Sequence, residues 1–401
     1  MLENKDASTG NHAQLNWASV IVLFACTVAS MAVIGIMVAL MMDLGEAFKV
    51  KGSDLGWAIA VFSLPSAIVA IFCGGVVDRF GGKQVSIAST LICVLGSIGT
   101  VYSNTFELLV LSLAVGGVGF TGISVAAPAV IVNASSGEQQ IRFMSFWSTY
   151  PPVAFACGLL LGAPFATTGD WKTPFAIHAI LMAVLTAALF ILPNVKVTGS
   201  PHWKGQLKSF AEVLKQVDVI RLSIVVAVPA ALAYGTGLVA PGYLAQTHGV
   251  SMGASAVTVA VVKGIAMIAC GIVTGLIISR NFSKGLLFAL LAVLGLVAQL
   301  MIFHPSSTFN IASASLFVWL VAYGGLGAIA MSLLSSVVRH PSQSGVASGM
   351  IGQMISILSF AVPATYFGMS GWTSYVSVAA LGLALSVIIL PVWFVRKIQV
   401  A

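Results

Sequence analysis

The stretch Gly74-Gly75-Val76-Val77-Asp78-Arg79-Phe80-Gly81-Gly82-Lys83 places charge and glycine between two long apolar runs. Charged groups so placed are not expected to lie in hydrocarbon, so the stretch predicts a tight turn at a membrane surface. Gly81-Gly82 would let the backbone reverse direction directly after Asp78 and Arg79. Arg79 and Lys83 put positive charge on one side of the membrane, and the positive-inside rule makes that side cytoplasmic.

The composition of the whole chain is that of an integral membrane protein. Of 401 residues, 59% are hydrophobic and 7% are charged, and the mean hydropathy is +1.04. A soluble domain carries about 25% charged residues. The net charge of +7 follows from where the basic residues lie and does not indicate nucleic-acid binding. The five cysteines sit inside apolar runs without metal-ligand spacing, so no metal or cofactor is expected.

Twelve apolar runs are long enough to cross a bilayer, which takes about 20 residues. They lie at about 17–42, 55–77, 84–103, 106–132, 142–168, 173–193, 220–245, 254–278, 284–303, 308–336, 343–368 and 372–395. If the N-terminus is inside, fourteen Lys and Arg residues fall on the cytoplasmic side and three on the other. This asymmetry predicts a multi-pass protein of a bacterial-type cell inner membrane, with both termini cytoplasmic.

The longest polar stretch divides the runs into two sets of six. We expect a cytoplasmic tail at 1–16, a first bundle at 17–193, a cytoplasmic linker at 194–219, a second bundle at 220–396 and a tail at 397–401. The tail at 1–16 lacks the basic region and cleavage site of a signal peptide. The halves are weakly alike, because residues 44–50 align with 244–250. Repeated halves are typical of secondary transporters.

Written as G-x-x-x-D-R-x-G-x-K, the opening stretch resembles the loop between helices 2 and 3 of the major facilitator superfamily. With the twelve runs and the linker, the resemblance covers nearly the whole chain, although the family often has a basic residue where Gly82 stands. It implies an all-α integral membrane fold of twelve transmembrane helices in two pseudo-symmetric six-helix bundles. It also implies a monomeric transporter of a small-molecule substrate that works by alternating access in the lipid bilayer, and neither an enzyme nor a cofactor protein.

The same resemblance assigns gating to the loop. Asp78 is expected near the start of helix 11, at Pro341-Ser342-Gln343, where its carboxylate would face a helix N-terminus and hold the cytoplasmic side shut. Arg79, Gly81 and Lys83 complete this predicted gating motif.

Lys263 is a charged residue inside an apolar run. It lies about ten residues into the eighth run, about 15 Å deep at a rise of about 1.5 Å per residue. A lysine there costs about 2.5–3.5 kcal/mol on insertion scales, so it is expected to face the protein interior or a water-filled cavity. All eleven acidic residues lie in loops or at run ends. We therefore expect Lys263 to attract an anionic substrate; a structural lysine paired with a polar neighbour is the alternative.

Anion and monocarboxylate carriers of the superfamily have a cationic residue in helix 8, which Lys263 resembles. Nitrate carriers have a second one in helix 2, where the repeat alignment puts Phe62, so nitrate is disfavoured. The arginine that family members carry in helix 4 before G-x-G is absent ahead of Gly117-Val118-Gly119. A proton coupled through Lys263, His178 or the substrate, an exchanged counter-substrate, and uniport all stay open.

Six further residues are predicted to line a substrate cavity: Trp147, Tyr150, Tyr234, Trp319, Tyr323 and Gln353. Trp147 and Tyr150 share a face of the fifth run ahead of the pair Pro151-Pro152, which should kink or loosen that helix. An interfacial aromatic belt is the alternative for these two residues. The aromatic residues also support a second function, an exporter of amphipathic drugs, metabolites or siderophores, in which Lys263 would be incidental.

Overall fold

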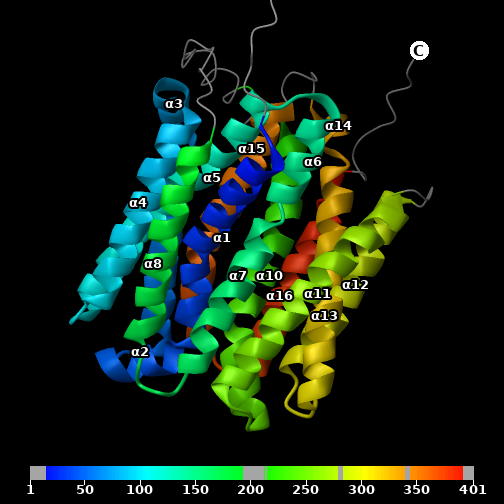
Figure 1. The fold of residues 1–401 in the computed structure, drawn as a ribbon. Helices are drawn as coiled ribbons and strands as arrows, with labels where there is room; N and C mark the ends of the chain where they lie inside the picture. Colours follow the sequence, from blue (N-terminus) through cyan, green and yellow to red (C-terminus); the bar gives the residue numbers. More distant parts are fainter. Residues whose placement is uncertain (1–14, 193–211, 213–214, 279–282, 339–343, 392–401) are drawn as a thin grey trace, which may run out of the picture.

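The computed structural model describes residues 15–192, 212, 215–278, 283–338 and 344–391, and its described part contains helices without any strand (Figure 1). The first half holds α1 (Trp17–Ala39), α2 (Met41–Phe48), α3 (Gly52–Phe80), α4 (Gly82–Val101), α5 (Phe106–Ala134), α6 (Gly137–Trp147), α7 (Tyr150–Gly162), η1 (Ala163–Phe165), α8 (Lys172–Ala188) and η2 (Leu189–Ile191). The second half holds α10 (Val217–His248), α11 (Met252–Ile278), α12 (Lys284–Phe303), α13 (Phe309–Met331), α14 (Leu334–Val337), α15 (Ser344–Gly368) and α16 (Trp372–Ile388).

These helices confirm the predicted all-α, twelve-helix membrane fold. Eight described segments are long and apolar enough to cross a membrane by length and composition. The helix α3, the pair α6–α7, α11 and α16 supply the other four positions in chain order. Large apolar side chains point outward along the helices, as lipid-facing positions require. Leu95 is 62% exposed and Leu381 is 73% exposed.

Two predicted spans differ from the structure. The first run was expected to continue to residue 42, but α1 ends at Ala39 and a short separate helix, α2, follows it. The fifth run is interrupted at Ser148-Thr149, between α6 and α7. This interruption confirms the expected loosening by Pro151-Pro152. Both prolines lie in the first turn of α7, where a missing N–H group costs least. The predicted linker falls mostly outside the described residues.

Within the first half, α1 and α7 approach each other through glycine. A Cβ on Gly158 would collide with the Ala32 carbonyl oxygen, and one on Gly35 would lie 2.7 Å from the Leu159 nitrogen. On the face of the molecule that carries α2, the buried Asp43 carboxylate accepts hydrogen bonds from the N–H groups of Thr167 (2.7 Å) and Gly169 (2.8 Å). These contacts fix α2 to the loop that follows η1.

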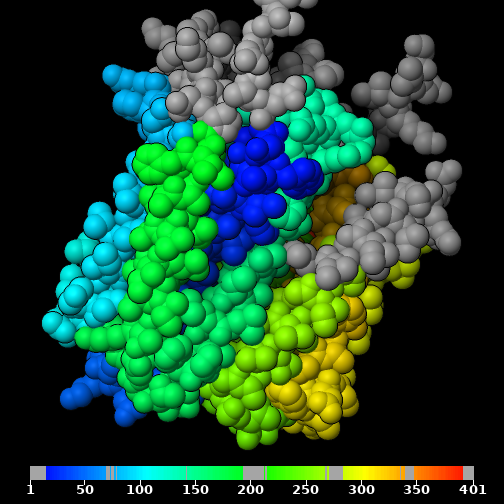
Figure 2. Space-filling view, in the orientation of Figure 1, coloured from blue at the N-terminus to red at the C-terminus, as the bar shows by residue number. Residues whose placement is uncertain are grey.

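For orientation, the terminal face is the one where α1 begins and η2 ends, uppermost in Figure 1, and the opposite face is the one that carries α2. The two halves meet along α3 and α15 and along α7 and α11. In Figure 2, α7 and α11 lie against each other in the lower part of the molecule. Near the opposite face, a Cβ on Gly56 would lie 2.7 Å from the Pro363 carbonyl oxygen, and one on Gly253 would lie 2.8 Å from that of Ala163. The halves are therefore closed there.

Candidate functional site

A cavity of about 440 Å³ lies between the two halves. Met31 borders it from α1, and the α6–α7 break and α7 supply a wall from the same half. From the second half, α10, α11 and α13 complete it. The lining side chains are mostly apolar, and their polar members are Ser148, Thr149, Tyr234, Lys263, Cys270 and Tyr323.

The order of the lining residues along each helix gives the cavity a direction. On α11, which runs toward the terminal face, the wall passes from Lys263 to Cys270. In the other half, the wall passes from Thr149, just before α7, to Phe155 on α7, which runs away from the terminal face. Lys263 and Phe155 therefore form the deep end, and the cavity extends from them toward the terminal face. Beyond them, toward the opposite face, lie the contacts that close the halves.

Lys263 lies where the sequence predicts it, in the cavity wall at mid-depth. It is eleven residues from the start of α11, about 16 Å along the axis at about 1.5 Å per residue. Its side chain is 7% exposed, and its Nζ atom lies 3.5 Å from the centroid of the Phe155 ring. In the described part of the chain, the ion pairs are Arg142–Glu138 and Arg221–Asp218, so no carboxylate neutralises Lys263 there.

Tyr234 and Tyr323 also border the cavity, as predicted. The buried Tyr234 hydroxyl approaches the Ser63 hydroxyl of the other half without a hydrogen bond of normal geometry. It is therefore a buried polar group beside the deep end of the cavity that lacks a hydrogen-bond partner among the described residues.

Trp147 and Tyr150 belong to an aromatic row beside the cavity. The Trp147 indole donates a hydrogen bond to the Thr27 hydroxyl of α1 at 3.3 Å, and its ring centroid is 5.0 Å from that of Tyr150. Phe120 of α5 continues the row, 6.4 Å from Tyr150. The structure thus places both residues in the first bundle's packing, next to cavity-lining Thr149 rather than on the cavity wall itself.

Trp319 and Gln353, which were predicted to line a substrate cavity, are not among the residues that line this one. Trp319 is fully buried against α12, because its ring fills the space left by Gly295. Trp319 is one helical turn from Tyr323 on α13, and the small difference in direction between the two positions points the Trp319 ring into the second bundle. The Gln353 amide donates a hydrogen bond to the Ala67 carbonyl oxygen, so it joins α15 to α3 at the seam between the halves.

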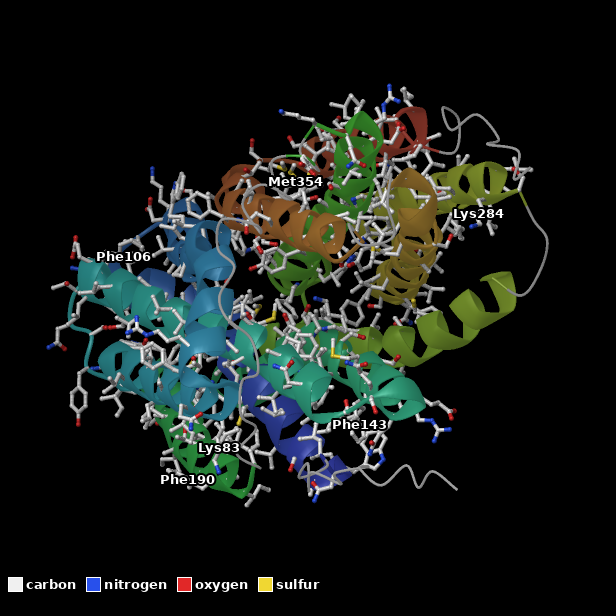
Figure 3. All side chains as sticks on the ribbon, turned by 90° about the horizontal axis from the view of Figure 1, so that it is seen from above. Lys83, Phe106, Phe143, Phe190, Lys284 and Met354 are labelled. Atoms are coloured by element: carbon white, nitrogen blue, oxygen red, sulfur yellow. The ribbon has the colours of Figure 1, made fainter. Side chains whose placement is uncertain are left out.

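The predicted gating motif is partly visible. Gly81 has φ of +89°, a conformation that favours glycine, and it ends α3 and begins α4 as the turn prediction requires. Lys83 donates hydrogen bonds to the carbonyl oxygens of Phe190 (2.9 Å) and Leu192 (2.6 Å), and Figure 3 shows it beside Phe190. Arg79 lies over the Phe80 ring. The Asp78 side chain and residues 339–343 lie outside the described residues.

Sequence reasoning missed Phe155 and Gly237. Phe155 was one apolar residue among many in its run, and only the packing of α7 against α11 brings its ring to Lys263. Gly237 lies in Tyr234-Gly235-Thr236-Gly237, a segment whose two glycines were an available signal of close approach between helices.

Residues 22–363 match the family model of the Major Facilitator Superfamily. Among curated proteins, the arabinose-proton symporter of Escherichia coli (strain K12) is 26% identical over 164 residues, which is 40% of this chain and 34% of the symporter. Multidrug resistance protein 2 of Bacillus subtilis (strain 168) is 26% identical over 159 residues, 40% of each chain. The match thus spans between a third and two fifths of the length of these relatives.

Solved structures show the same fold over almost the whole chain. An inward-open structure of the xylose transporter XylE from E. coli has a TM-score of 0.71 at 16% identity, and the match covers 95% of this chain and 97% of that one. An inward-facing, unoccupied bacterial homologue of the human lysosomal transporter Spinster has a TM-score of 0.72 at 14% identity, covering 93% and 94%.

Proposed function

Because the chain belongs to the Major Facilitator Superfamily, we propose that it is a secondary transporter that moves a small organic anion across the cell inner membrane by alternating access. Lys263 is its binding group for the anion. The carrier acts as a monomer with both termini in the cytoplasm, so that the cavity extends toward the cytoplasmic side. A proton or a second anion serves as the coupling partner.

The observation that carries this proposal is the position of Lys263. Its ammonium group is held at the deep end of a cavity between the halves, and the described residues offer it an aromatic ring but no carboxylate. A lysine in the membrane is costly unless it has a partner or faces water. An anion that arrives through the cavity provides that partner, and an ammonium–carboxylate hydrogen bond is among the stronger kinds.

The rest of the wall fits the body of such a solute. Met31, Leu320 and the alanines of α10 and α11 are apolar, so they suit a carbon skeleton, while the Tyr234 and Tyr323 hydroxyls can hold a second polar group. An aromatic-lined exporter cavity is less well supported, because the Trp147 and Trp319 rings pack inside their own bundles.

The proposal is tested with sodium salts of acetate, lactate, benzoate, oxalate and malonate, each measured for its effect on the thermal unfolding of the purified carrier. At least one acid should raise the unfolding temperature of wild type, and Lys263→Gln should abolish the effect while folding and membrane insertion survive. Lys172→Gln is the matched control, since Lys172 also lies over an aromatic ring, Trp171, but is exposed outside the cavity. Equal stabilisation of wild type and Lys263→Gln, or none in wild type, refutes the site.

A further inference from the structure

The path of the Lys263 side chain crosses α10 at Gly237. A Cβ built on Gly237 would collide with the Lys263 Nζ atom and lie 3.0 Å from its Cε atom. Both of these atoms belong to the far end of the lysine. The bare backbone of Gly237 therefore leaves a notch in α10, and the notch holds the end of the Lys263 side chain.

The notch and the Phe155 ring border the ammonium from opposite halves of the protein. Gly237 belongs to α10 and Phe155 to α7, and the ring centroid is 3.5 Å from Nζ. An ammonium group over an aromatic face is attracted by the ring's negative charge density. Gly237 is buried, as is its neighbour Thr236, whose hydroxyl accepts a hydrogen bond from Gln299 of α12 at 2.8 Å. This anchor keeps the notch in a fixed place on α10.

We propose that Gly237 is a positioning residue of the anion site: its notch, together with Phe155, sets where the Lys263 ammonium is presented to the substrate. This inference rests on the proposed function. A side chain at position 237 would displace the ammonium from the notch and so change its position over the ring. The substrate anion would then meet a displaced and more mobile partner, and its affinity would fall although every charged group is still present.

The collision at Gly237 involves only the end of a flexible side chain, so Gly237→Ala should fold. Two other glycines supply matched controls. Apart from the chain neighbours and the nearby backbone of the same helix, no described heavy atom lies within 4 Å of a Cβ built on Gly242 of α10 or on Gly264, which follows Lys263 in the chain. Alanine at either control position makes the same chemical change without touching the ammonium.

The first measurement reads the ammonium position without any substrate. Lysine labelled with ¹³C at Cε is incorporated into the full-length carrier in detergent, and the Lys263 signal is assigned by its absence in Lys263→Gln. Because the group lies over the Phe155 ring, its protons should be shifted upfield by the ring current. The shift should shrink in Phe155→Leu, change in Gly237→Ala, and stay as in wild type in Gly242→Ala and Gly264→Ala. An unchanged Lys263 signal in Gly237→Ala overturns the inference.

The second measurement uses the acid from the panel above that stabilises wild type most. Gly237→Ala should bind it about five- to tenfold more weakly, as expected when one charge-assisted contact is misaligned rather than removed. In transport, weaker binding should raise KM with little change in the maximal rate. A purely structural defect would instead lower the amount of active carrier and therefore the maximal rate. If Lys263→Gln loses the acid but Gly237→Ala binds it like wild type, the positioning role alone fails. If Lys263→Gln retains it, the proposed function fails.

Discussion

The contact between Lys263 and Phe155 joins the two halves, so breaking it should shift the carrier between its conformations. In this structure the halves are in contact near the opposite face, and the Lys263 ammonium lies over the Phe155 ring. Rocking of the halves to open the opposite face would separate the ammonium from the ring. Phe155→Leu removes the ring and keeps an apolar side chain. The expected result is a larger population of the state in which the opposite face opens.

The magnitude follows from burial. A cation over an aromatic ring contributes about 0.5–1 kcal/mol when exposed and about 2 kcal/mol or more when desolvated. Phe155 is 2% exposed and Lys263 is 7% exposed, so the larger figure applies. About 2 kcal/mol corresponds to a change of about 30-fold in the ratio of the two states.

The assay measures distances between spin labels at Ser145 and Ser336, which are exposed positions in opposite halves, on α6 and α14. The five native cysteines are first replaced. Phe175→Leu is the control, because Phe175 is also fully buried but packs against Trp171 away from the cavity. If the distance distribution of Phe155→Leu is identical to that of wild type, this pair does not hold the opposite face closed. The same conclusion follows if Phe155→Leu causes an equal shift in the Lys263→Met background.

Three further outcomes are expected. Asp43→Ala should lower the unfolding free energy by about 2–4 kcal/mol in chemical denaturation, because two backbone donors lose a charged acceptor; Glu46→Ala, on the same short helix, should change it little. Thr236→Val should cost about 1–3 kcal/mol by leaving the buried Gln299 amide unsatisfied; stability equal to wild type would contradict this pairing. Gly158→Leu should prevent folding, since α1 and α7 touch backbone to backbone there; folded protein with normal yield in fluorescence size exclusion would show that the helices can separate.

The all-helical fold and the order of its membrane helices could be predicted from sequence because they depend on local quantities. Apolar length, loop charge and the glycine turn at Gly81 each act within one segment, and the structure confirms the helices and that turn. The interruption before Pro151-Pro152 was likewise accessible, since proline acts on its own helix. Where α1 ends and α2 begins was not, because both lie in one continuous apolar run.

The cavity wall could be predicted only in part, since it depends on how helices are rotated against one another. Lys263 could be identified because charge in hydrocarbon is rare, whatever the surroundings. Trp319 could not be told from Tyr323, because both are aromatic and only one helical turn apart, yet one packs on Gly295 and the other borders the cavity. Phe155 carries no signal of its own; its importance comes from a partner on another helix.

The break in the fifth span leaves main-chain acceptors without their helical donors beside the solute path. Pro151 and Pro152 have no N–H, so the carbonyl groups of Trp147 and Ser148 lose the donors that an unbroken helix supplies. In a hydrocarbon environment such carbonyls need a donor from elsewhere, and Ser148 borders the cavity. Water molecules, or hydroxyls on the cargo, can meet that need. A preference for hydroxylated cargo at this wall would then come from backbone carbonyl groups. It would persist when neighbouring side chains are substituted and disappear when the two prolines are replaced.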